Sequence, residues 1–153
     1  MITLQTIHQE DFEHFLEQEI GEYANDHVRN GNWPTEGALE RSGKEFDSLL
    51  PDGIYSKDQY VWSIVNEDNK KTGVLWVQVK EGKAFIYDFI IDETFRGKGF
   101  GKQALTAMDE KLKSMNIESV GLHVFGDNVT AQALYKKMGF KITGIHMLKK
   151  FNS

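Results

Sequence analysis

Hydrophobic and polar positions repeat along this chain with two different periods, and each change of period marks a new element. Residues 1–7 alternate apolar and polar side chains, which predicts a short first strand. From Glu10 the apolar residues recur at steps of three and four, which predicts an amphipathic helix that ends at Gly31–Pro34. A second helix is expected from about Thr35 to Leu50, followed by a proline–glycine turn.

The period of two returns in the middle of the chain. Tyr60–Val65 and Gly73–Val79 are predicted strands that a polar loop joins into a hairpin. A turn at Glu81–Lys83 leads into a third strand at Ala84–Ile91, which is almost continuously apolar, as buried strands are. Three consecutive antiparallel strands are therefore expected.

The last third of the chain alternates helices and strands. Gln103–Met115 has the apolar spacing of a helix, and a strand is expected at Ser119–Phe125. Because a helix connects them, this strand should run parallel to the strand before the helix. A helix at Asn128–Met138 and one or two strands over Phe140–Phe151 follow. The order β-α-α-β-β-β-α-β-α-β predicts an α/β (α+β mixed) fold, with a mixed sheet flanked by helices.

Composition narrows the class of protein. A chain of 153 residues is expected to form a single domain, residues 1–153. Its net charge of −5 argues against a nucleic-acid partner. The chain has no cysteine, so it has no disulfide, thiol nucleophile or cysteine-based metal site, and no metal is expected. The sequence lacks the apolar core of a signal peptide and any run long enough to span a membrane, which predicts a cytoplasmic protein.

One stretch between the buried strand and the following helix alternates glycines with other residues: Arg96-Gly97-Lys98-Gly99-Phe100-Gly101-Lys102. A helix N-terminus presents unpaired N–H groups and a partial positive charge, which together bind phosphate. Glycine allows the backbone to approach the anion closely, and the three basic side chains add positive charge. The stretch therefore predicts a pyrophosphate-binding turn; a glycine-rich turn without a ligand is the alternative.

The spacing of the glycines separates this turn from other phosphate-binding motifs. It matches neither the dinucleotide fingerprint G-x-G-x-x-G nor the P-loop. As R-x-x-G-x-G, it resembles the acyl-CoA pyrophosphate motif of the GNAT superfamily, the GCN5-related N-acetyltransferases. Downstream, Asn128–Phe140 is similar to the family's segment N-x-x-A-x-x-x-Y-x-x-x-G-F. The resemblance covers about residues 84 to 142, and the family's usual proline before the turn is absent.

The resemblance implies a GNAT-like domain in which the strands at Ala84–Ile91 and Ser119–Phe125 splay apart to admit the pantetheine arm of acetyl-CoA. An N–H group near Ile91 would then face the thioester oxygen and stabilise an oxyanion. The implied reaction moves the acetyl group directly to a primary amine of a small molecule, a peptide or a protein. The implied coenzyme contacts are Phe89, Ile90, Ile91, Arg96, Gly97, Lys98, Gly99, Phe100, Gly101, Lys102, Asn128 and Tyr135.

Three residues are candidates for proton transfer. Tyr135 falls on the motif's tyrosine, so the resemblance makes it the general acid for the leaving thiolate; a core tyrosine is the alternative. His123 and Asp88 lie on the two strands that would flank the cleft and are candidate bases. The alternatives for these two are a structural histidine and a satisfied buried carboxylate. Asn128 is either a helix cap alone or also a neighbour of the coenzyme.

Several points stay open in the sequence. A non-catalytic acyl-CoA-binding sensor would keep the turn and lose the acid, and the presence of Tyr135 argues against it. The acceptor amine, the use of other acyl groups and the formation of a homodimer are not specified. The first two helices and Trp33 between them would suit a cationic amine, or their carboxylates form a solvated face. These carboxylates are Glu17, Glu19, Glu22, Glu36, Glu40, Glu45 and Asp47.

Overall fold

The computed structural model describes residues 1–151, and one five-stranded mixed sheet forms its centre. The strands lie in the order β1-β2-β3-β4-β5; the first four are antiparallel neighbours, and β5 runs parallel to β4. The predicted fold class is therefore confirmed. The strands are β1 (Thr3–Thr6), β2 (Gln59–Val65), β3 (Lys71–Lys80), β4 (Lys83–Ile91) and β5 (Ser119–Leu122).

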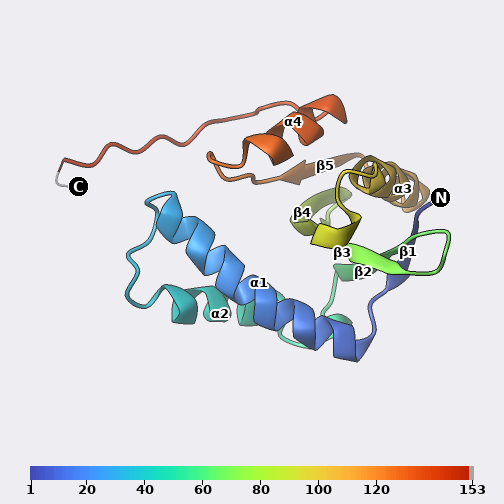
Figure 1. Cartoon of the computed structure of the whole chain (residues 1–153), viewed down its shortest axis with the longest axis horizontal. Helices are drawn as coiled ribbons and strands as arrows, with labels where there is room; N and C mark the ends of the chain where they lie inside the picture. Colours follow the sequence, from blue (N-terminus) through green and yellow to red (C-terminus); the bar gives the residue numbers. More distant parts are fainter. Residues whose placement is uncertain (152–153) are drawn as a thin grey trace.

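Helices cover both faces of the sheet (Figure 1): α1 and α2 pack on one face, and α3 and α4 on the other. Among residues 1–151 no helix is both long and apolar enough to cross a membrane. In the same part of the chain no three His, Asp or Glu side chains are placed to hold a metal ion. The cytoplasmic location stays a prediction. The helices are α1 (Gln9–Arg29), α2 (Ala38–Leu49), α3 (Phe100–Ser114) and α4 (Val129–Lys137), with 3₁₀ turns at Gly53–Tyr55 and Glu93–Phe95.

Each face of the sheet has its own hydrophobic core, because successive side chains of a strand point to opposite faces. On β3, Trp76 packs with Phe12 and Phe15 of α1, while the preceding Leu75 packs on the α3 side. The buried indole N–H of Trp76 donates to Gln59 Oε1 at 2.7 Å, so its polar atom is satisfied. These two cores fix the position of β3 in the middle of the domain.

The end of β4 is held against β3 at one glycine. A Cβ atom on Gly73 would lie 1.9 Å from the backbone oxygen of Ile90, a separation that no side chain permits. The small residue therefore allows β3 to position residues 89–91 of β4. This is the part of β4 that is predicted to contact the coenzyme.

Two element boundaries differ from their predictions. Helix α2 begins at Ala38 rather than near Thr35, because Gly37 has a φ of 78°, a left-handed conformation that no α-helix contains. Strand β5 ends at Leu122 rather than Phe125, because its pairing with β4 stops there. In both cases the type of element is predicted correctly from the local period, and the neighbouring structure decides at which residue the element begins or ends.

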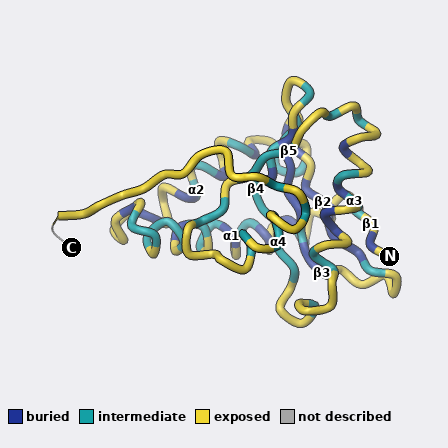
Figure 2. Tube along the Cα trace, turned by 90° about the horizontal axis from the view of Figure 1, so that it is seen from above, coloured by how far each residue is buried: buried dark blue, intermediate teal, exposed yellow. Residues whose placement is uncertain are grey.

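The predicted strand or strands over Phe140–Phe151 are wrong. This segment contains neither strand nor helix, although its sequence has strand-like character. A strand is defined by hydrogen bonds to a neighbouring strand, and the segment has no such neighbour within residues 1–151. Figure 2 shows it as an exposed line that leaves the body of the domain.

Candidate active site

The glycine-rich turn forms the N-terminus of α3, as predicted. Gly97 and Gly99 have φ values of 76° and 82°, a left-handed conformation that glycine adopts without strain. Gly99 is the N-cap residue, and no side chain caps the helix, which leaves its first N–H groups available to an anion. Lys98 and Lys102 are exposed on the same turn. The turn thus offers the donors and the charge that a pyrophosphate requires.

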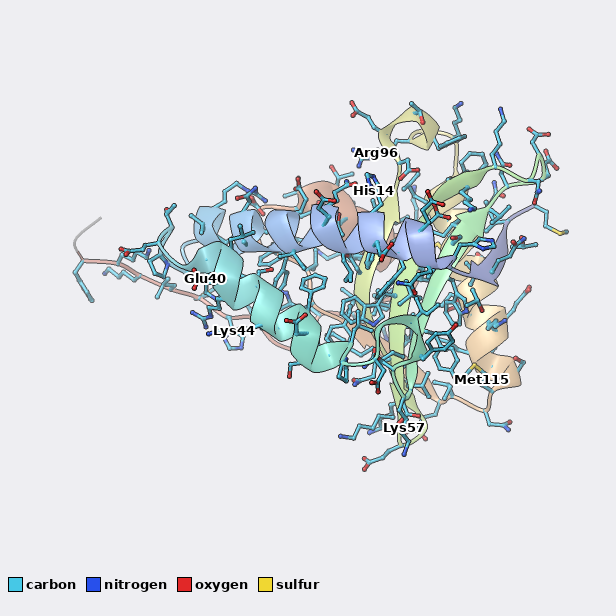
Figure 3. The ribbon with its side chains drawn as sticks, turned by 90° about the horizontal axis from the view of Figure 1, so that it is seen from below. His14, Glu40, Lys44, Lys57, Arg96 and Met115 are labelled. Atoms are coloured by element: carbon cyan, nitrogen blue, oxygen red, sulfur yellow. The ribbon has the colours of Figure 1, made fainter. Side chains whose placement is uncertain are left out.

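Arg96 connects this turn to the end of β4 through a hydrogen bond. Its Nε donates to the backbone oxygen of Ile91 at 2.8 Å. Burial raises the pKa of Asp92, and the charge of Arg96 offsets part of this rise. Figure 3 shows Arg96 close to His14 of α1. The guanidinium therefore links the turn to the strand, and its contact with a coenzyme stays a prediction.

Two further residues of the turn take part in packing. The ring of Phe100 lies 6.1 Å from that of Phe95, between centroids. A Cβ atom on Gly101 would meet Leu134 Cδ2 at 3.4 Å and Phe89 Cζ at 3.9 Å. These are ordinary van der Waals separations, so Gly101 packs beside α4 and the end of β4, which places the turn beside the gap described next.

Strands β4 and β5 separate where the coenzyme is expected to enter. Their pairing stops at Ile86 and Leu122, so the rest of β4 has no neighbour on that side. The N–H of Asp92 donates to Thr72 of β3 at 2.8 Å. Because successive N–H groups of a strand point to opposite edges, the N–H of Ile91 faces the gap. The strands therefore splay as the resemblance implied, with a backbone donor at the opening.

A β-bulge in β4 determines the face of the sheet to which the side chain of Asp88 points. In the register with β3, Tyr87 has no partner and is the extra residue of β4. Strict alternation would place Asp88 with Ile86 on the α3 side of the sheet. Because of the extra residue, Asp88 instead meets Glu19 of α1. Its Oδ1 also accepts the backbone N–H of Phe89 at 3.0 Å.

Asp88 and Glu19 form a pair of carboxyl groups between β4 and α1, joined by a side-chain hydrogen bond. Burial, together with the nearby charge of Asp88, raises the pKa of Glu19 to about 9. Burial also raises the pKa of Asp88, to about 6, although hydrogen bonds from Glu19 and from the N–H of Phe89 lower it. At neutral pH Glu19 therefore keeps its proton while Asp88 is ionised, which gives Asp88 the character of a base.

Glu19 was predicted only as one of seven carboxylates that face either an acceptor amine or solvent, although its position carried a further signal. It lies four residues after Phe15 and four before Tyr23, on the apolar face of α1. It is only 9% exposed, so the solvated-face interpretation is wrong for this carboxylate. The helical period alone places Glu19 on that face but does not say what it meets.

We expect Glu19→Gln to change how stability depends on pH. The folded-state pKa of Glu19 lies above its ordinary value of 4.5, so the folded protein holds a proton that the unfolded chain releases. Stability should therefore fall as pH rises from about 5 to about 9. Glutamine keeps the hydrogen bond without ionising, so the variant should be more stable than wild type at pH 9 by roughly 1–3 kcal/mol, and similar at pH 5. Urea denaturation at both pH values tests this, and parallel pH curves for the two proteins would contradict it.

Tyr135 approaches Asp88 from α4. Its ring packs against Phe89 and Phe140, with centroids 6.4 Å and 5.5 Å away. Burial and the charge of Asp88 raise the pKa of Tyr135 to about 12, so the phenol is protonated at neutral pH. Of the three predicted catalytic residues, Tyr135 and Asp88 thus lie near enough to each other to interact electrostatically.

His123 directly follows β5. Its side chain is exposed, and its ring meets Phe125 edge-on with centroids 5.2 Å apart. Phe125 in turn contacts Tyr23 and His27 of α1, and the ring of His27 stacks on Trp33 at 4.0 Å. His123 therefore belongs to the rim of an aromatic cluster beside the gap. A role of His123 in proton transfer stays a prediction.

Asn128 is the N-cap of α4. Its Oδ1 accepts the backbone N–H of Ala131 at 3.1 Å, which confirms the capping role. Gln132 holds the preceding loop, because its Nε2 donates to the backbone oxygens of Phe125 (3.2 Å) and Gly126 (3.1 Å). A contact between Asn128 and the coenzyme stays a prediction.

Comparison with known proteins agrees with this architecture of splayed strands beside a glycine-rich helix N-terminus. The model of the Acetyltransferase (GNAT) family matches residues 7–140. The chain therefore belongs to the GNAT acetyltransferase family, as its two motifs predicted.

Several relatives align with this chain. It is 36% identical over 152 residues to YdgE of Bacillus subtilis (strain 168), described as an uncharacterized N-acetyltransferase, with 97% of each chain covered. It is 38% identical over 153 residues to YycN of the same strain, described likewise, with 97% of this chain and 98% of YycN covered. The crystal structure of YycN superposes with a TM-score of 0.96 over 100% of both chains, at 37% identity. A shorter match, 35% over 66 residues, covers 42% of this chain and 43% of the spermine/spermidine N(1)-acetyltransferase of that strain.

Proposed function

We propose that this protein transfers the acetyl group of acetyl-CoA directly to a primary amine of a small molecule or a peptide. The observation that carries the proposal is that Asp88, at the end of β4, lies near enough to Tyr135 of α4 for its charge to act on the phenol. An ionised carboxylate and a protonated phenol are the base and the acid that acyl transfer to an amine needs. Membership of the GNAT family supports acetyl-CoA as the donor.

The reaction can be followed atom by atom with these residues. The amine nitrogen attacks the thioester carbon, and the N–H of Ile91 donates to the oxyanion that forms. Asp88 accepts the proton that the amine loses, directly or through water. The C–S bond then breaks, and Tyr135 gives its proton to the leaving thiolate. Direct attack needs no nucleophile from the protein, which agrees with a chain that has no cysteine.

The charges around the gap favour a cationic acceptor. The carboxylates of Glu22 and Asp26 follow Glu19 along α1 and act on it electrostatically, and the ion pair of Asp26 with Arg29 offsets part of this charge. A negative region of this kind attracts an amine that carries additional positive charge. The local similarity to a spermine/spermidine N(1)-acetyltransferase makes polyamines the first acceptors to test.

Calorimetric titration tests donor binding. Wild type is expected to bind acetyl-CoA, and the double variant Lys98→Glu/Lys102→Glu is expected to bind about 10- to 100-fold more weakly, because charge-assisted contacts to the pyrophosphate are lost. Lys44→Glu/Lys57→Glu is the matched control, because it changes the net charge by the same amount and Figure 3 shows both lysines away from Arg96. A wild type that does not bind acetyl-CoA contradicts the proposal. Equal weakening in the control would assign the effect to net charge.

Release of CoA tests catalysis against a panel of polyamines, monoamines and peptides. Because the chain has no cysteine, a thiol reagent detects only the CoA that the reaction releases. Amine-dependent release is the expected result. Binding of acetyl-CoA without release for any amine would favour the non-catalytic acyl-CoA-binding sensor instead.

A further inference from the structure

The two groups proposed for proton transfer belong to different elements, and helix α1 contacts the neighbourhood of each. Asp88 lies on β4 and Tyr135 lies on α4. The pairing of β4 with β5 stops before Asp88 is reached, so the sheet alone does not hold the two groups in register. Near its middle, α1 contacts Asp88 through Glu19; at its end, Arg29 contacts the loop that leads into α4.

The contact at the end of α1 is a network of charged and polar side chains. The Nε of Arg29 donates to Asp127 Oδ2, and the Nδ2 of Asn30 donates to Asp127 Oδ1 at 3.1 Å. These hydrogen bonds lower the pKa of Asp127, so its carboxylate is ionised at neutral pH. Asp26 holds both donors, because its side chain pairs with Arg29 and its backbone oxygen accepts from Asn30 at 2.8 Å. We call Arg29, Asn30 and Asp127 the α1–α4 clamp.

Helix α4 has little else to fix its first turn. None of its residues is buried, whereas α1, α2 and α3 all contain buried side chains. Asp127 directly precedes Asn128, the N-cap of α4. Among residues 1–151, the side-chain hydrogen bonds of Asn128 and Gln132 stay within the segment 125–132, and those of Asp127 alone join this segment to another element. Because elements with few buried contacts open easily, the clamp should decide how firmly α4 is held.

The electrostatics of the two helix ends favour the clamp. The C-terminal end of α1 carries a partial negative charge that attracts Arg29, and the N-terminal end of α4 carries a partial positive charge that attracts Asp127. Phe125 adds aromatic contacts with α1 earlier in the loop. The side chains at the junction leave a hollow between them, which is lined by Asp26, Arg29, Phe125, Asp127 and Asn128. Charged contacts rather than close packing therefore join the two helix ends.

We infer that Arg29 is a positioning residue for acetyl transfer: through Asp127 it fixes the N-terminal end of α4, and it thereby holds the phenol of Tyr135 in its place. The inference rests on the proposed function, because it assigns Arg29 a role that acts through Tyr135. Helix α1 thus sets the positions of both proton-transfer groups, Asp88 by way of Glu19 and Tyr135 by way of the clamp. Accurate placement matters because a displacement of about 1 Å can lower the rate by ~100-fold.

Steady-state kinetics with the full chain test this role. Arg29→Ala is expected to lower kcat by roughly 10- to 100-fold, whereas the affinity for acetyl-CoA should change by less than about threefold. The affinity should persist because the glycine-rich turn lies on α3, outside the clamp. Asp127→Ala should cause the same loss. The double variant should be no slower than either single variant, because the two residues act as one unit.

Two further variants serve as controls. Arg29→Lys keeps a cation beside Asp127 and should recover part of the lost kcat. Lys71→Ala removes the cation of another exposed ion pair of α1, the pair of Lys71 with Asp11, and changes the net charge by the same amount as Arg29→Ala. It should keep wild-type turnover. All variants should melt close to wild type, because exposed ion pairs contribute little to global stability.

Hydrogen exchange measures how α4 is held without any acceptor. Amides 132–137 should exchange about 10-fold faster in Arg29→Ala than in wild type or in Lys71→Ala. Equal exchange in Arg29→Ala and wild type would overturn the inference, as would faster exchange with an unchanged kcat. Faster exchange in a chain that acetylates no amine would support the clamp as the anchor of α4 and would overturn the proposed function, which separates the two failures.

Discussion

Replacing Tyr135 with phenylalanine is expected to lower kcat by roughly 10²–10⁴-fold, while the affinity for acetyl-CoA changes little. The substitution removes the phenol but keeps the ring that packs against Phe89 and Phe140. The fold should therefore persist, and the leaving thiolate should lose its proton donor. Steady-state kinetics with an acceptor from the amine panel, together with a thermal melt, measure both effects.

The matched control for this prediction is Tyr60→Phe, which changes a tyrosine on β2 that packs on Trp62. The control should keep wild-type turnover. If chemistry limits the rate and Tyr135→Phe turns over as fast as the control, Tyr135 is a core residue and another group supplies the proton. Loss of stability in Tyr135→Ala would then measure its packing.

Asp88→Asn is expected to lower kcat/KM by roughly 10²–10³-fold, because asparagine cannot accept the proton of the amine. The pH profile should change as well. In wild type, activity should rise with pH as Asp88 ionises, with an apparent pKa near 6. This acid limb should disappear in the variant. Asparagine still offers an oxygen to the N–H of Phe89, so the fold should be retained.

Asp68→Asn is the control for this variant, because Asp68 lies exposed in the loop between β2 and β3. It should change neither the rate nor the pH profile. His123→Gln provides a second comparison, since His123 is the other candidate base. A larger loss in His123→Gln than in Asp88→Asn would transfer the role of base to the histidine at the rim of the aromatic cluster.

Local patterns in the sequence predicted most of the elements. The period of α1, the hairpin of β2 and β3, and the turn at Gly97 and Gly99 follow from side chains close together in the chain. Amphipathic spacing and left-handed glycines act over a few residues, so the sequence shows them directly. The two motifs also indicated the family. They further predicted that the glycine-rich turn and Tyr135 belong to the same site.

The tertiary structure decided the chemistry around Asp88. The extra residue at Tyr87 reverses the direction of the next side chain, and no local period predicts such a bulge. Burial of Glu19 depends on how α1 lies across β4, two elements distant in the sequence.

The sequence by itself thus determined the helices, the hairpin, the glycine-rich turn and the family, because each rests on short-range periodicity or on spaced motifs. Only the tertiary structure decided that Asp88 and Glu19 share a site, and that residues 140–151 form no strand within the described chain. The shared site of Asp88 and Glu19 and the missing strand at residues 140–151 have the same physical reason. A carboxyl group acquires its pKa, and a strand its hydrogen bonds, from neighbours that the fold supplies.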